Sequence, residues 1–312
     1  MKCDKCGGKA VFHMRHHKLA LCQADYLAWL PQQVERAIEK YKMFSHQDRL
    51  LVAVSGGKDS LSLWDILHKL GYAVDGLYIS LGIDGGVNYS AESRRLSEQF
   101  AGSRGLHLHV VDVAAEYGAG IPQIAERAQR GRGKACSVCG LAKRHIMNRV
   151  ARQGGYQVLA TGHNLDDEAA VLFGNTLTWA GSYLLRQGPV LEARDEGLVR
   201  KVKPLCRIYE REMAAYAWLG GIEYIYDECP FAVGATSLYY KDLLNQLESE
   251  RPGAKLNFYL SFLRAKAAGL FSPDADPDRP LLHTCPACGQ PTTAPGECTF
   301  CRMTSKLQPG ET

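Results

Sequence analysis

The chain has 312 residues, of which 46% are hydrophobic and 22% are charged, and its formal net charge at pH 7 is +4. This length allows one large domain with a buried core and small appendages. An apolar run of about 18 residues and a basic-then-apolar leader are both missing, which argues against a membrane span and predicts a soluble protein of the cytoplasm. The mild positive charge permits a nucleic-acid partner without demonstrating one.

Short apolar runs alternate with segments of helical patterning from residue 50 onward. We predict strands at residues 50–54, 73–80, 107–111 and 156–160. We predict helices between them at residues 60–70, 92–104 and 141–152. This alternation indicates an α/β protein with a doubly wound parallel sheet, in which ligands bind beyond the carboxyl ends of the strands.

Less regular segments surround this alternation. Further helices are expected at residues 31–44, 210–219, 241–250 and 256–270, and a polar stretch at residues 192–203 interrupts the body. Residues 272–280 are rich in Pro and Asp, as a linker would be. The expected domains are a small metal-binding module at residues 1–30, the main α/β domain at residues 31–275 and a second metal-binding module at residues 276–312.

The chain contains eleven cysteines, which fall into three groups. The groups are Cys3, Cys6 and Cys22; Cys136, Cys139, Cys206 and Cys229; and Cys285, Cys288, Cys298 and Cys301. In a reducing compartment, grouped cysteines usually hold metal or carry out chemistry instead of forming disulfides. The odd total also argues against complete pairing.

The hexapeptide SGGKDS follows the first predicted strand directly. It is not a P-loop, because the G-x-x-x-x-G-K-[ST] spacing is absent and Asp59 stands where a hydroxyl residue should follow Lys58. Its glycines let the backbone approach phosphate oxygens, and the next helix supplies free N–H groups. The expected polyphosphate-binding residues are Ser55, Gly56, Gly57, Lys58, Asp59 and Ser60. A plain strand-to-helix turn is the alternative, but such a turn does not require the whole hexapeptide.

This hexapeptide matches, position by position, the motif of the ATP-pyrophosphatase or PP-loop superfamily, which cleaves ATP between its α- and β-phosphates and adenylates a substrate oxygen. A second segment, TGHNLDD at Thr161–Asp167, resembles the nucleotide segment of the tRNA-modifying branch. There, Asp166 and Asp167 are candidate ligands for Mg²⁺ or a substrate group, and a helix cap is the alternative. The resemblance implies that Gly162, His163 and Asp166 contribute to the ATP site.

The motif CSVCG lies between the third and fourth predicted strands, just before a helix. The helix N-terminus is expected to lower the thiol pKa of Cys136 and Cys139 and to favour thiolates, which bind iron or attack sulfur. Cys229 precedes a proline that can hold a thiol at a cleft, whereas Cys206 is interpreted as a small buried hydrophobic residue. Three cysteines would leave one iron of a [4Fe–4S] cluster open to an exogenous sulfur atom.

The combination of these motifs, with cysteine knuckles at both ends, resembles the TtuA-type tRNA 2-thiouridine synthetases over nearly the whole chain. It resembles the wobble-uridine tRNA thiolases more distantly. The resemblance implies a [4Fe–4S] cluster on Cys136, Cys139 and Cys229, with Lys143 and Asp167 as catalytic residues. Contact with tRNA phosphate from an exposed helix face is the alternative for Lys143.

The resemblance also implies the chemistry and the partners. ATP would adenylate the C2 oxygen of a flipped-out uridine, sulfur delivered at the cluster would attack C2, and AMP would leave. The T-loop uridine 54 is the target in this branch, and the anticodon wobble uridine is the target in the other. The implied partners are tRNA, a ubiquitin-like sulfur donor with a C-terminal thiocarboxylate and a second copy of the chain in a homodimer.

Cysteine pairs near the two ends predict two structural zinc ions. The C-terminal ligands are the four thiolates of Cys285, Cys288, Cys298 and Cys301. The N-terminal thiolates are those of Cys3, Cys6 and Cys22. The resembling family usually has a histidine as the fourth ligand where this chain has Asp25. Alternatives are His13, His16 or His17, or a three-ligand site that has lost its metal.

Basic residues gather near the central cysteines and again at residues 200–203. They are Arg127, Arg130, Arg132, Lys134, Lys143, Arg144 and His145 in the first group, and Arg200, Lys201 and Lys203 in the second. They are candidate contacts for RNA phosphates, with a solvated surface as the alternative. Two rival functions are thiolation through a cysteine persulfide without iron, and a metal-bearing RNA-binding protein with a vestigial ATP loop.

Overall fold

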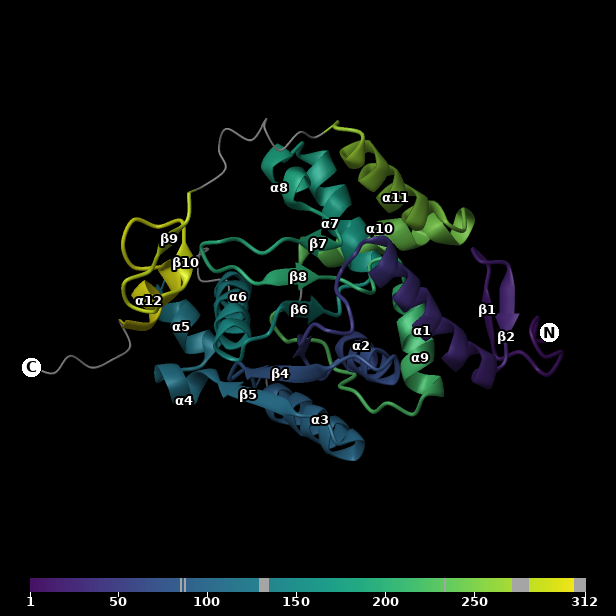
Figure 1. Cartoon of the computed structure of the whole chain (residues 1–312), viewed down its shortest axis with the longest axis horizontal. Helices are drawn as coiled ribbons and strands as arrows, with labels where there is room; N and C mark the ends of the chain where they lie inside the picture. Colours follow the sequence, from purple (N-terminus) through teal and green to yellow (C-terminus); the bar gives the residue numbers. More distant parts are fainter. Residues whose placement is uncertain (85, 87, 129–134, 233, 271–280, 306–312) are drawn as a thin grey trace, which may run out of the picture.

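The computed structural model describes residues 1–84, 86, 88–128, 135–232, 234–270 and 281–305. An N-terminal hairpin, a large α/β body and a C-terminal knuckle follow one another along the longest axis of the molecule (Figure 1). Within these residues, no helix is both long enough and apolar enough to cross a membrane.

A six-stranded sheet forms the centre of the body, in the order β5-β4-β3-β6-β8-β7. Its strands are β3 (Leu50–Val54), β4 (Val74–Ser80), β5 (Leu108–Asp112), β6 (Val158–Thr161), β7 (Val190–Leu191) and β8 (Arg200–Val202). Neighbouring strands are parallel except β7 and β8, which confirms the predicted α/β class. The prediction that residues 192–203 merely interrupt the body is wrong, because β8 lies there and pairs with β6. A strand so short and polar has no apolar run by which to recognise it.

The helices that the structure describes cover both faces of this sheet or, like the last of them, belong to the C-terminal knuckle. They are α1 (Gln23–Lys40), α2 (Lys58–Lys69), α3 (Tyr89–Arg104), α4 (Val113–Tyr117), α5 (Ile121–Ala128), α6 (Ala135–Gln153), α7 (Leu165–Leu177), α8 (Gly181–Arg186), α9 (Glu210–Leu219), α10 (Thr236–Glu250), α11 (Ala254–Ala267) and α12 (Thr299–Thr304). The prediction for α9 is confirmed to the residue, whereas α6 begins earlier than predicted and α7 is absent from the prediction. Helix α1 begins inside the expected N-terminal module.

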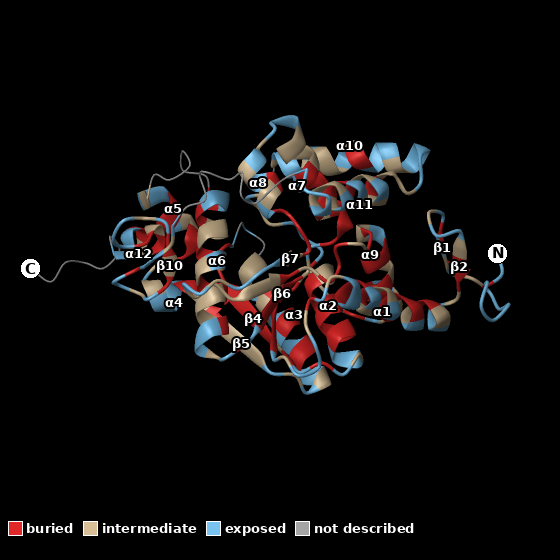
Figure 2. Ribbon diagram, turned by 45° about the horizontal axis from the view of Figure 1, so that its top comes forward, coloured by how far each residue is buried: buried red, intermediate tan, exposed pale blue. Residues whose placement is uncertain are grey.

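Two hydrophobic cores lie on the two faces of the sheet, because side chains alternate along each strand. Leu50, Val52 and Val54 of β3 pack into one core with α1, α2 and α9. Leu51 of the same strand packs into the other core with α5 and α6. Figure 2 shows buried residues along the strands and on the inner sides of these helices. The loops at the carboxyl ends of the strands are therefore held by a sheet that is covered on both faces.

The two small hairpins belong to the ends of the chain. Strand β1 (Phe12–Met14) pairs with β2 (Leu19–Leu21), and β9 (His283–Thr284) pairs with β10 (Pro291–Thr292). The C-terminal knuckle also packs on the body: Phe300 shares the core of α5 and α6, and His145 of α6 stacks on it with ring centroids 4.2 Å apart. Burial lowers the pKa of His145 to about 4. This placement favours a packing role for His145 over contact with RNA.

Asp65 of α2 joins three helices inside the first core. Its carboxylate lies 2.7 Å from Lys69 Nζ, 2.8 Å from Arg104 Nε of α3 and 2.8 Å from the hydroxyl of Tyr216 of α9. Burial raises the pKa of Asp65, but its three partners outweigh this effect and hold the pKa below its ordinary value. The carboxylate is therefore charged and fully paired in the folded protein.

We expect Asp65→Asn to lower the free energy of unfolding by about 2 kcal/mol at neutral pH, because it removes a charged acceptor from buried hydrogen bonds. Because the folded pKa is lowered, this stabilisation is present above the unfolded carboxyl pKa of about 4 and is lost as the pH falls through the folded pKa. Urea unfolding at several pH values measures the effect. Glu98→Gln, which breaks an exposed pair with Arg94, is the control and should change little. A difference that stays constant in acid would contradict this account of Asp65.

Candidate active site

The phosphate loop closes on itself at the carboxyl end of β3. Ser60 Oγ accepts a hydrogen bond from Ser55 N at 3.1 Å and donates one to Gly57 O at 3.0 Å. Gly56 has φ +76°, and a Cβ at this position would lie 2.6 Å from Ser93 O of α3. Among the described residues, no side chain caps the N-terminus of α2, which leaves its N–H groups available to a phosphate.

The segment Thr161–Asp167 lies directly against this loop. A Cβ on Gly162 would lie 3.0 Å from Ser60 N and 3.1 Å from the carbonyl carbon of Asp59, so the two backbones touch at this glycine. Asn164 Nδ2 also donates to Asp59 Oδ1 at 3.3 Å, across 105 residues of sequence. The two segments therefore form one continuous surface.

The two carboxylates at the start of α7 have different surroundings. Asp167 caps the helix, since its Oδ2 accepts from Asn164 N at 3.0 Å and its N donates to Asn164 Oδ1 at 3.1 Å. Its carboxylate also lies 2.6 Å from Lys241 Nζ. Asp166 is buried and binds Lys255 Nζ at 2.5 Å. Asp167 therefore takes part in the helix cap, as the alternative interpretation expected. Asp166 is held in a buried ion pair.

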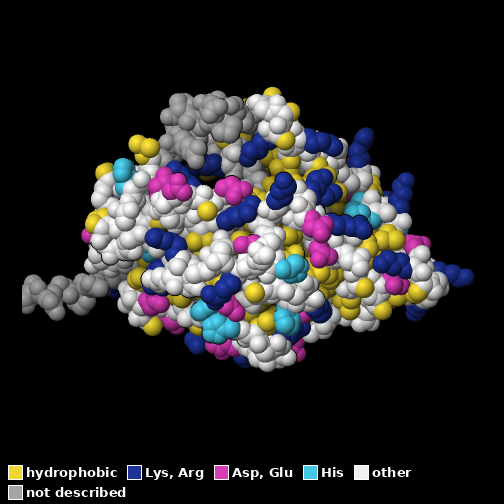
Figure 3. All heavy atoms as spheres, in the orientation of Figure 1, with side chains coloured by type: hydrophobic (Ala, Val, Ile, Leu, Met, Phe, Trp, Pro, Cys, Tyr) yellow, Lys and Arg dark blue, Asp and Glu magenta, His cyan; other side chains and the backbone are white. Residues whose placement is uncertain are grey.

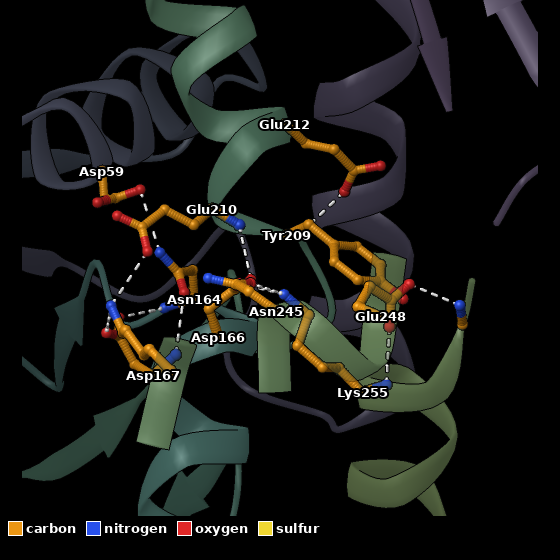
Figure 4. A network of polar contacts seen from close by, with 12 residues as sticks. Asp59, Asn164, Asp166, Asp167, Tyr209, Glu210, Glu212, Asn245, Glu248 and Lys255 are labelled. Atoms are coloured by element: carbon orange, nitrogen blue, oxygen red, sulfur yellow. Dashed lines mark hydrogen bonds and ion pairs between the residues drawn. The ribbon is translucent and has the colours of Figure 1, made fainter. Parts of the chain in front are cut away.

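Lys58 turns away from the cavity beside its own loop. Its Nζ lies 2.7 Å from Glu210 Oε1 and 3.2 Å from Asp59 Oδ2, and it lines a separate cavity of about 540 Å³. Glu210 also lies 3.1 Å from Lys241, which connects Lys58 to Asp167. Figure 4 shows Asp59, Asp167 and Glu210 in this one polar network. The motif lysine is therefore neutralised by carboxylates in this conformation.

A cavity of about 320 Å³ opens beside the phosphate loop. Its lining includes apolar side chains from β3, β4 and nearby elements, namely Ala53, Val54, Leu77, Ile79, Leu81 and Met147. It also includes polar residues, among them Ser55, Asp59, Ser60, Lys143, Gly162, His163 and Lys201. Burial raises the pKa of Asp59 to about 6 and lowers that of His163 to about 4, so the imidazole is neutral at pH 7. A cavity that combines apolar side chains with a few polar and charged groups suits a ligand with an apolar ring and a charged tail.

The central cysteines lie in the first turns of α6, not ahead of the helix as predicted. Cys136 Sγ lies 3.1 Å from Phe231 O, which brings this helix against the turn that carries Cys229. Burial raises the thiol pKa of Cys139, and the neighbouring Lys143 opposes the shift. The prediction of a lowered pKa is therefore wrong for Cys139, because desolvation outweighs the helix N-terminus.

The distances between their sulfur atoms distinguish these three cysteines from the ligands of a zinc site. Four zinc–sulfur bonds of about 2.3 Å in a tetrahedron place the sulfurs about 3.8 Å apart. Among the described residues, the sulfurs of Cys136, Cys139 and Cys229 do not form a set within 4.8 Å of one another. At least one pair of these sulfurs is therefore farther apart than the thiolates of a tetrahedral zinc site. Three thiol groups are a donor set that suits an iron–sulfur cluster.

The C-terminal cysteines do have the spacing of a single ion. Cys288 and Cys298 Sγ lie 3.8 Å apart, and Cys285 and Cys301 Sγ lie 3.9 Å apart. The backbone N–H of Cys298 donates to Cys285 Sγ at 3.1 Å, as backbone N–H groups around metal-bound thiolates do. The donor set fits a tetrahedral metal ion.

The N-terminal group has the same compactness, with Asp25 as its fourth member. Cys6 and Cys22 Sγ lie 3.7 Å apart, and Asp25 Oδ2 lies 3.0 Å from Cys3 Sγ and 3.2 Å from Cys22 Sγ. Hydrogen bonds from the three thiols hold the pKa of Asp25 below its ordinary value. The structure therefore places Asp25 where a fourth ligand belongs.

Two of the alternative ligands, His16 and His17, lie elsewhere. Their Nε2 atoms are 3.0 Å and 3.5 Å from Glu212 Oε1 on α9. Burial raises the pKa of Glu212, and the two histidines and the Tyr209 N–H outweigh it and hold the pKa below its ordinary value. These histidines thus fasten the β1–β2 turn to the body. The proposal of either as the fourth ligand is wrong.

The other predicted residues are dispersed. Cys206 is fully buried in the first core, and burial raises its pKa, which confirms it as a small buried residue. Arg130, Arg132 and Lys134 lie outside the described residues. Lys143 reaches the cavity beside the phosphate loop, and Arg144 lines a neighbouring depression. On the face in Figure 3, Lys and Arg side chains stand among Asp and Glu across the upper half of the view.

Three residues near the site are not among those predicted from the sequence. Tyr89 lines the cavity, and burial together with Cys229 raises its pKa to about 12. Glu210 and Lys241 meet at the network of Lys58, although they are 31 residues apart in the chain. Only the acidic first turn of the predicted helix 210–219 hinted at Glu210.

The sheet and its loop define a PP-loop protein, and the family described as PP-loop domain matches residues 30–231. Residues 2–27 match the family described as 2-thiouridine synthetase TtuA, N-terminal LIM domain. The chain belongs to the TtuA family of 2-thiouridine synthetases.

Curated relatives cover almost the whole chain. The tRNA-5-methyluridine(54) 2-sulfurtransferase of Thermus thermophilus is 49% identical over 97% of this chain and 91% of its own length. The protein of the same name from Thermotoga maritima is 45% identical over 99% of this chain and 97% of its own length. Among solved structures, the U34-tRNA thiolase NcsA from Methanococcus maripaludis, with its [4Fe–4S] cluster, has a TM-score of 0.79 at 23% identity, covering 100% of this chain and 98% of that one. This likeness shows a shared fold.

Proposed function

We propose that this chain is a tRNA sulfurtransferase that uses ATP to replace the C2 oxygen of uridine 54 with sulfur. One observation carries the proposal: the phosphate loop and Lys143, the neighbour of Cys139, line the same cavity. Activation and sulfur delivery can therefore act on one bound base. The relatives named tRNA-5-methyluridine(54) 2-sulfurtransferase point to tRNA as the substrate and to the T-loop position.

ATP is proposed to bind with its base against the apolar lining of the cavity and its phosphates on the loop. The open N-terminus of α2 and the Ser55 hydroxyl supply donors to the phosphates. Asp59 is the proposed Mg²⁺ carboxylate, because it lies at the cavity and magnesium prefers oxygen ligands. Asp167 is proposed to act beside it, and Asp166 to hold α9 through Glu210 N at 2.8 Å.

The proposed reaction has two steps. The uridine O2 attacks the α-phosphorus, the bond to the β-phosphate oxygen breaks, pyrophosphate leaves with the electron pair, and the proton of N3 is lost. Sulfur at the oxidation level of hydrosulfide then adds to C2, the C2–O2 bond breaks, AMP leaves with O2, and N3 regains a proton. No oxidant or reductant is needed. Adenylation is required because a carbonyl oxygen is a poor leaving group.

The cysteine side of the cavity is proposed to supply the sulfur. Cys136, Cys139 and Cys229 would hold a [4Fe–4S] cluster, which supplies an open iron for an exogenous sulfur atom. Lys143 stands between these cysteines and the cavity, where its charge stabilises negative charge that develops at C2. A ubiquitin-like thiocarboxylate protein as donor, a homodimer and a cytoplasmic location are proposed with it, on family resemblance.

Nucleoside mass spectrometry tests the proposal. A deletion strain should lose 2-thiouridine derivatives from the T-loop, and purified protein with ATP, a sulfide source and unmodified tRNA should restore them while releasing AMP and pyrophosphate. Loss of 2-thiolation at the wobble position instead would assign the chain to the other branch. Unchanged tRNA, without tRNA-dependent AMP release, would favour the metal-bearing RNA-binding protein.

Anaerobic purification separates the two sulfur chemistries. About four iron and four sulfide per chain are expected for the cluster. An active protein without iron would establish the persulfide route through the same cysteines.

Two zinc ions per chain are also proposed, one in each terminal module. We expect Cys298→Ser to reduce bound zinc from two to one and to lower the thermal unfolding midpoint, because this knuckle shares the core of α5 and α6. Asp25→His should keep both ions, whereas Asp25→Ala should weaken the N-terminal one. Elemental analysis after dialysis against a chelator measures all three variants. Full zinc retention by Cys298→Ser would contradict the site.

A further inference from the structure

The three basic residues of segment 200–203 have separate surroundings. Arg200 pairs with Glu192 at 3.2 Å, and Lys203 pairs with the buried Glu168 at 2.7 Å. Lys201 lies between them in sequence, yet no hydrogen bond or ion pair reaches its ammonium group from any residue that the structure describes. One cation of this segment is therefore left without a partner.

Strand register decides where Lys201 points. On β8 it lies opposite Leu159 of β6, whereas Val202 lies opposite Ala160. Leu159 belongs to the core beneath α6, and Val202 and Ala160 belong to the core on the other face. The side chain of Lys201 consequently emerges on the α6 side, where it lines the cavity beside the phosphate loop.

The surroundings of Lys201 favour an incoming anion. Burial, together with Lys203 and Arg144, lowers its pKa to about 8, and Glu168 opposes the shift. Lys143 and His163 also face the cavity. Lys201 is half-buried, and an unpaired cation that has lost part of its hydration is costly. A phosphate that enters the cavity relieves this cost.

Lys58 is less suited to this task in the present arrangement. Its ammonium group is held by Glu210 and Asp59, and it lines the separate 540 Å³ cavity. The loop offers backbone N–H groups to phosphates, and Lys201 reaches the same cavity from β8, on the face of the sheet that α6 covers. In the proposed binding mode, the phosphorus under attack would therefore lie between the loop and Lys201.

We propose that Lys201 binds the α-phosphate of ATP and of the adenylated uridine, and stabilises AMP as it leaves. This role rests on the proposed function. Negative charge on the α-phosphate oxygens is spread in the transition state of nucleotidyl transfer, and AMP departs with one charge more than the phosphodiester carries. The contact is therefore stronger during the reaction than in the ATP complex and should affect kcat more than ATP binding.

The test compares Lys201→Met and Lys201→Arg with Arg194→Met, which lies in the connection between β7 and β8 and pairs with Glu196 at 2.9 Å. We expect Lys201→Met to reduce the kcat of tRNA-dependent AMP formation by about 10²-fold, with the Kd for ATP changed less than about threefold. Arg194→Met should keep the wild-type rate. A Lys201→Met rate near wild type, or a loss confined to the Kd for ATP, would overturn the inference.

A pH profile separates this contact from a structural role. The wild-type kcat/KM for ATP should fall above about pH 8, because this is the pKa of Lys201 before a phosphate binds, and Lys201→Arg should keep its kcat/KM there because the guanidinium stays charged. Failure of Lys201→Arg to remove the alkaline limb would overturn the inference. Wild-type protein that releases no AMP with tRNA would instead contradict the proposed function itself.

Discussion

Cys139→Ala should reduce thiolation of uridine by at least about 10³-fold, because the residue is a proposed cluster ligand next to Lys143, the proposed catalytic lysine. Iron and sulfide should be lost from the purified protein at the same time. Adenylation involves the phosphate loop and not Cys139, so tRNA-dependent release of pyrophosphate should persist in a single turnover, whereas AMP, which leaves only when sulfur attacks C2, should not be formed. Iron analysis, tRNA nucleoside mass spectrometry and a pyrophosphate assay on the same preparation measure the three quantities.

Cys206→Ala is the matched control for this variant. It also removes a single thiol, but one that is buried in the core on the opposite face of the sheet. It should keep iron and thiolation and cost only a modest amount of stability. Thiolation that survives in Cys139→Ala, or iron that disappears equally in Cys206→Ala, would refute the assignment of the cluster ligands.

Gly56→Ala should reduce ATP-dependent AMP formation by about 10²-fold, because even a small displacement of a phosphate loop misplaces the reacting phosphorus. The new Cβ would lie 2.6 Å from Ser93 O, which is backbone of α3 and cannot turn aside as a side chain can. Either the loop or the helix must move. Steady-state AMP formation and ATP binding by calorimetry measure the result.

Gly71→Ala controls for the backbone strain of this substitution. Gly71 has φ +81°, close to the +76° of Gly56, but a Cβ there meets no atom within 4 Å. Both variants bear the cost of a left-handed alanine, about 1 kcal/mol, and only Gly56→Ala meets α3. Equal loss of activity in the two variants would show that strain, and not the contact with Ser93, is responsible.

The phosphate loop could be predicted because its chemistry is contiguous. Six adjacent residues specify a backbone that approaches phosphates, and the apolar run before them places the loop at the end of a strand. The C-terminal knuckle was predictable for the same reason, since its cysteine pairs are close in sequence. Helix α7 was missed although TGHNLDD marks its start, because its apolar residues run without a clear period.

Other features depend on residues that are far apart in the chain. Lys58 meets Glu210 across 152 residues, and His16 meets Glu212 across 196. Neither glutamate lies in a motif, so no local pattern in the sequence predicts either pair. The raised pKa of Cys139 likewise follows from how deeply α6 is packed, which the helix N-terminus alone does not reveal.

By itself, the sequence determined the α/β class, the nucleotide loop and the cysteine sets, because strand periodicity, glycine conformation and ligand spacing are local properties. Only the tertiary structure decided which lysine side chains point into the cavity. The register of β8 against β6 turns Lys201 into the cavity, and the carboxylate of Glu210 draws Lys58 out of it. The physical reason is that a charged side chain is oriented by the charges and the burial that surround it in the folded chain.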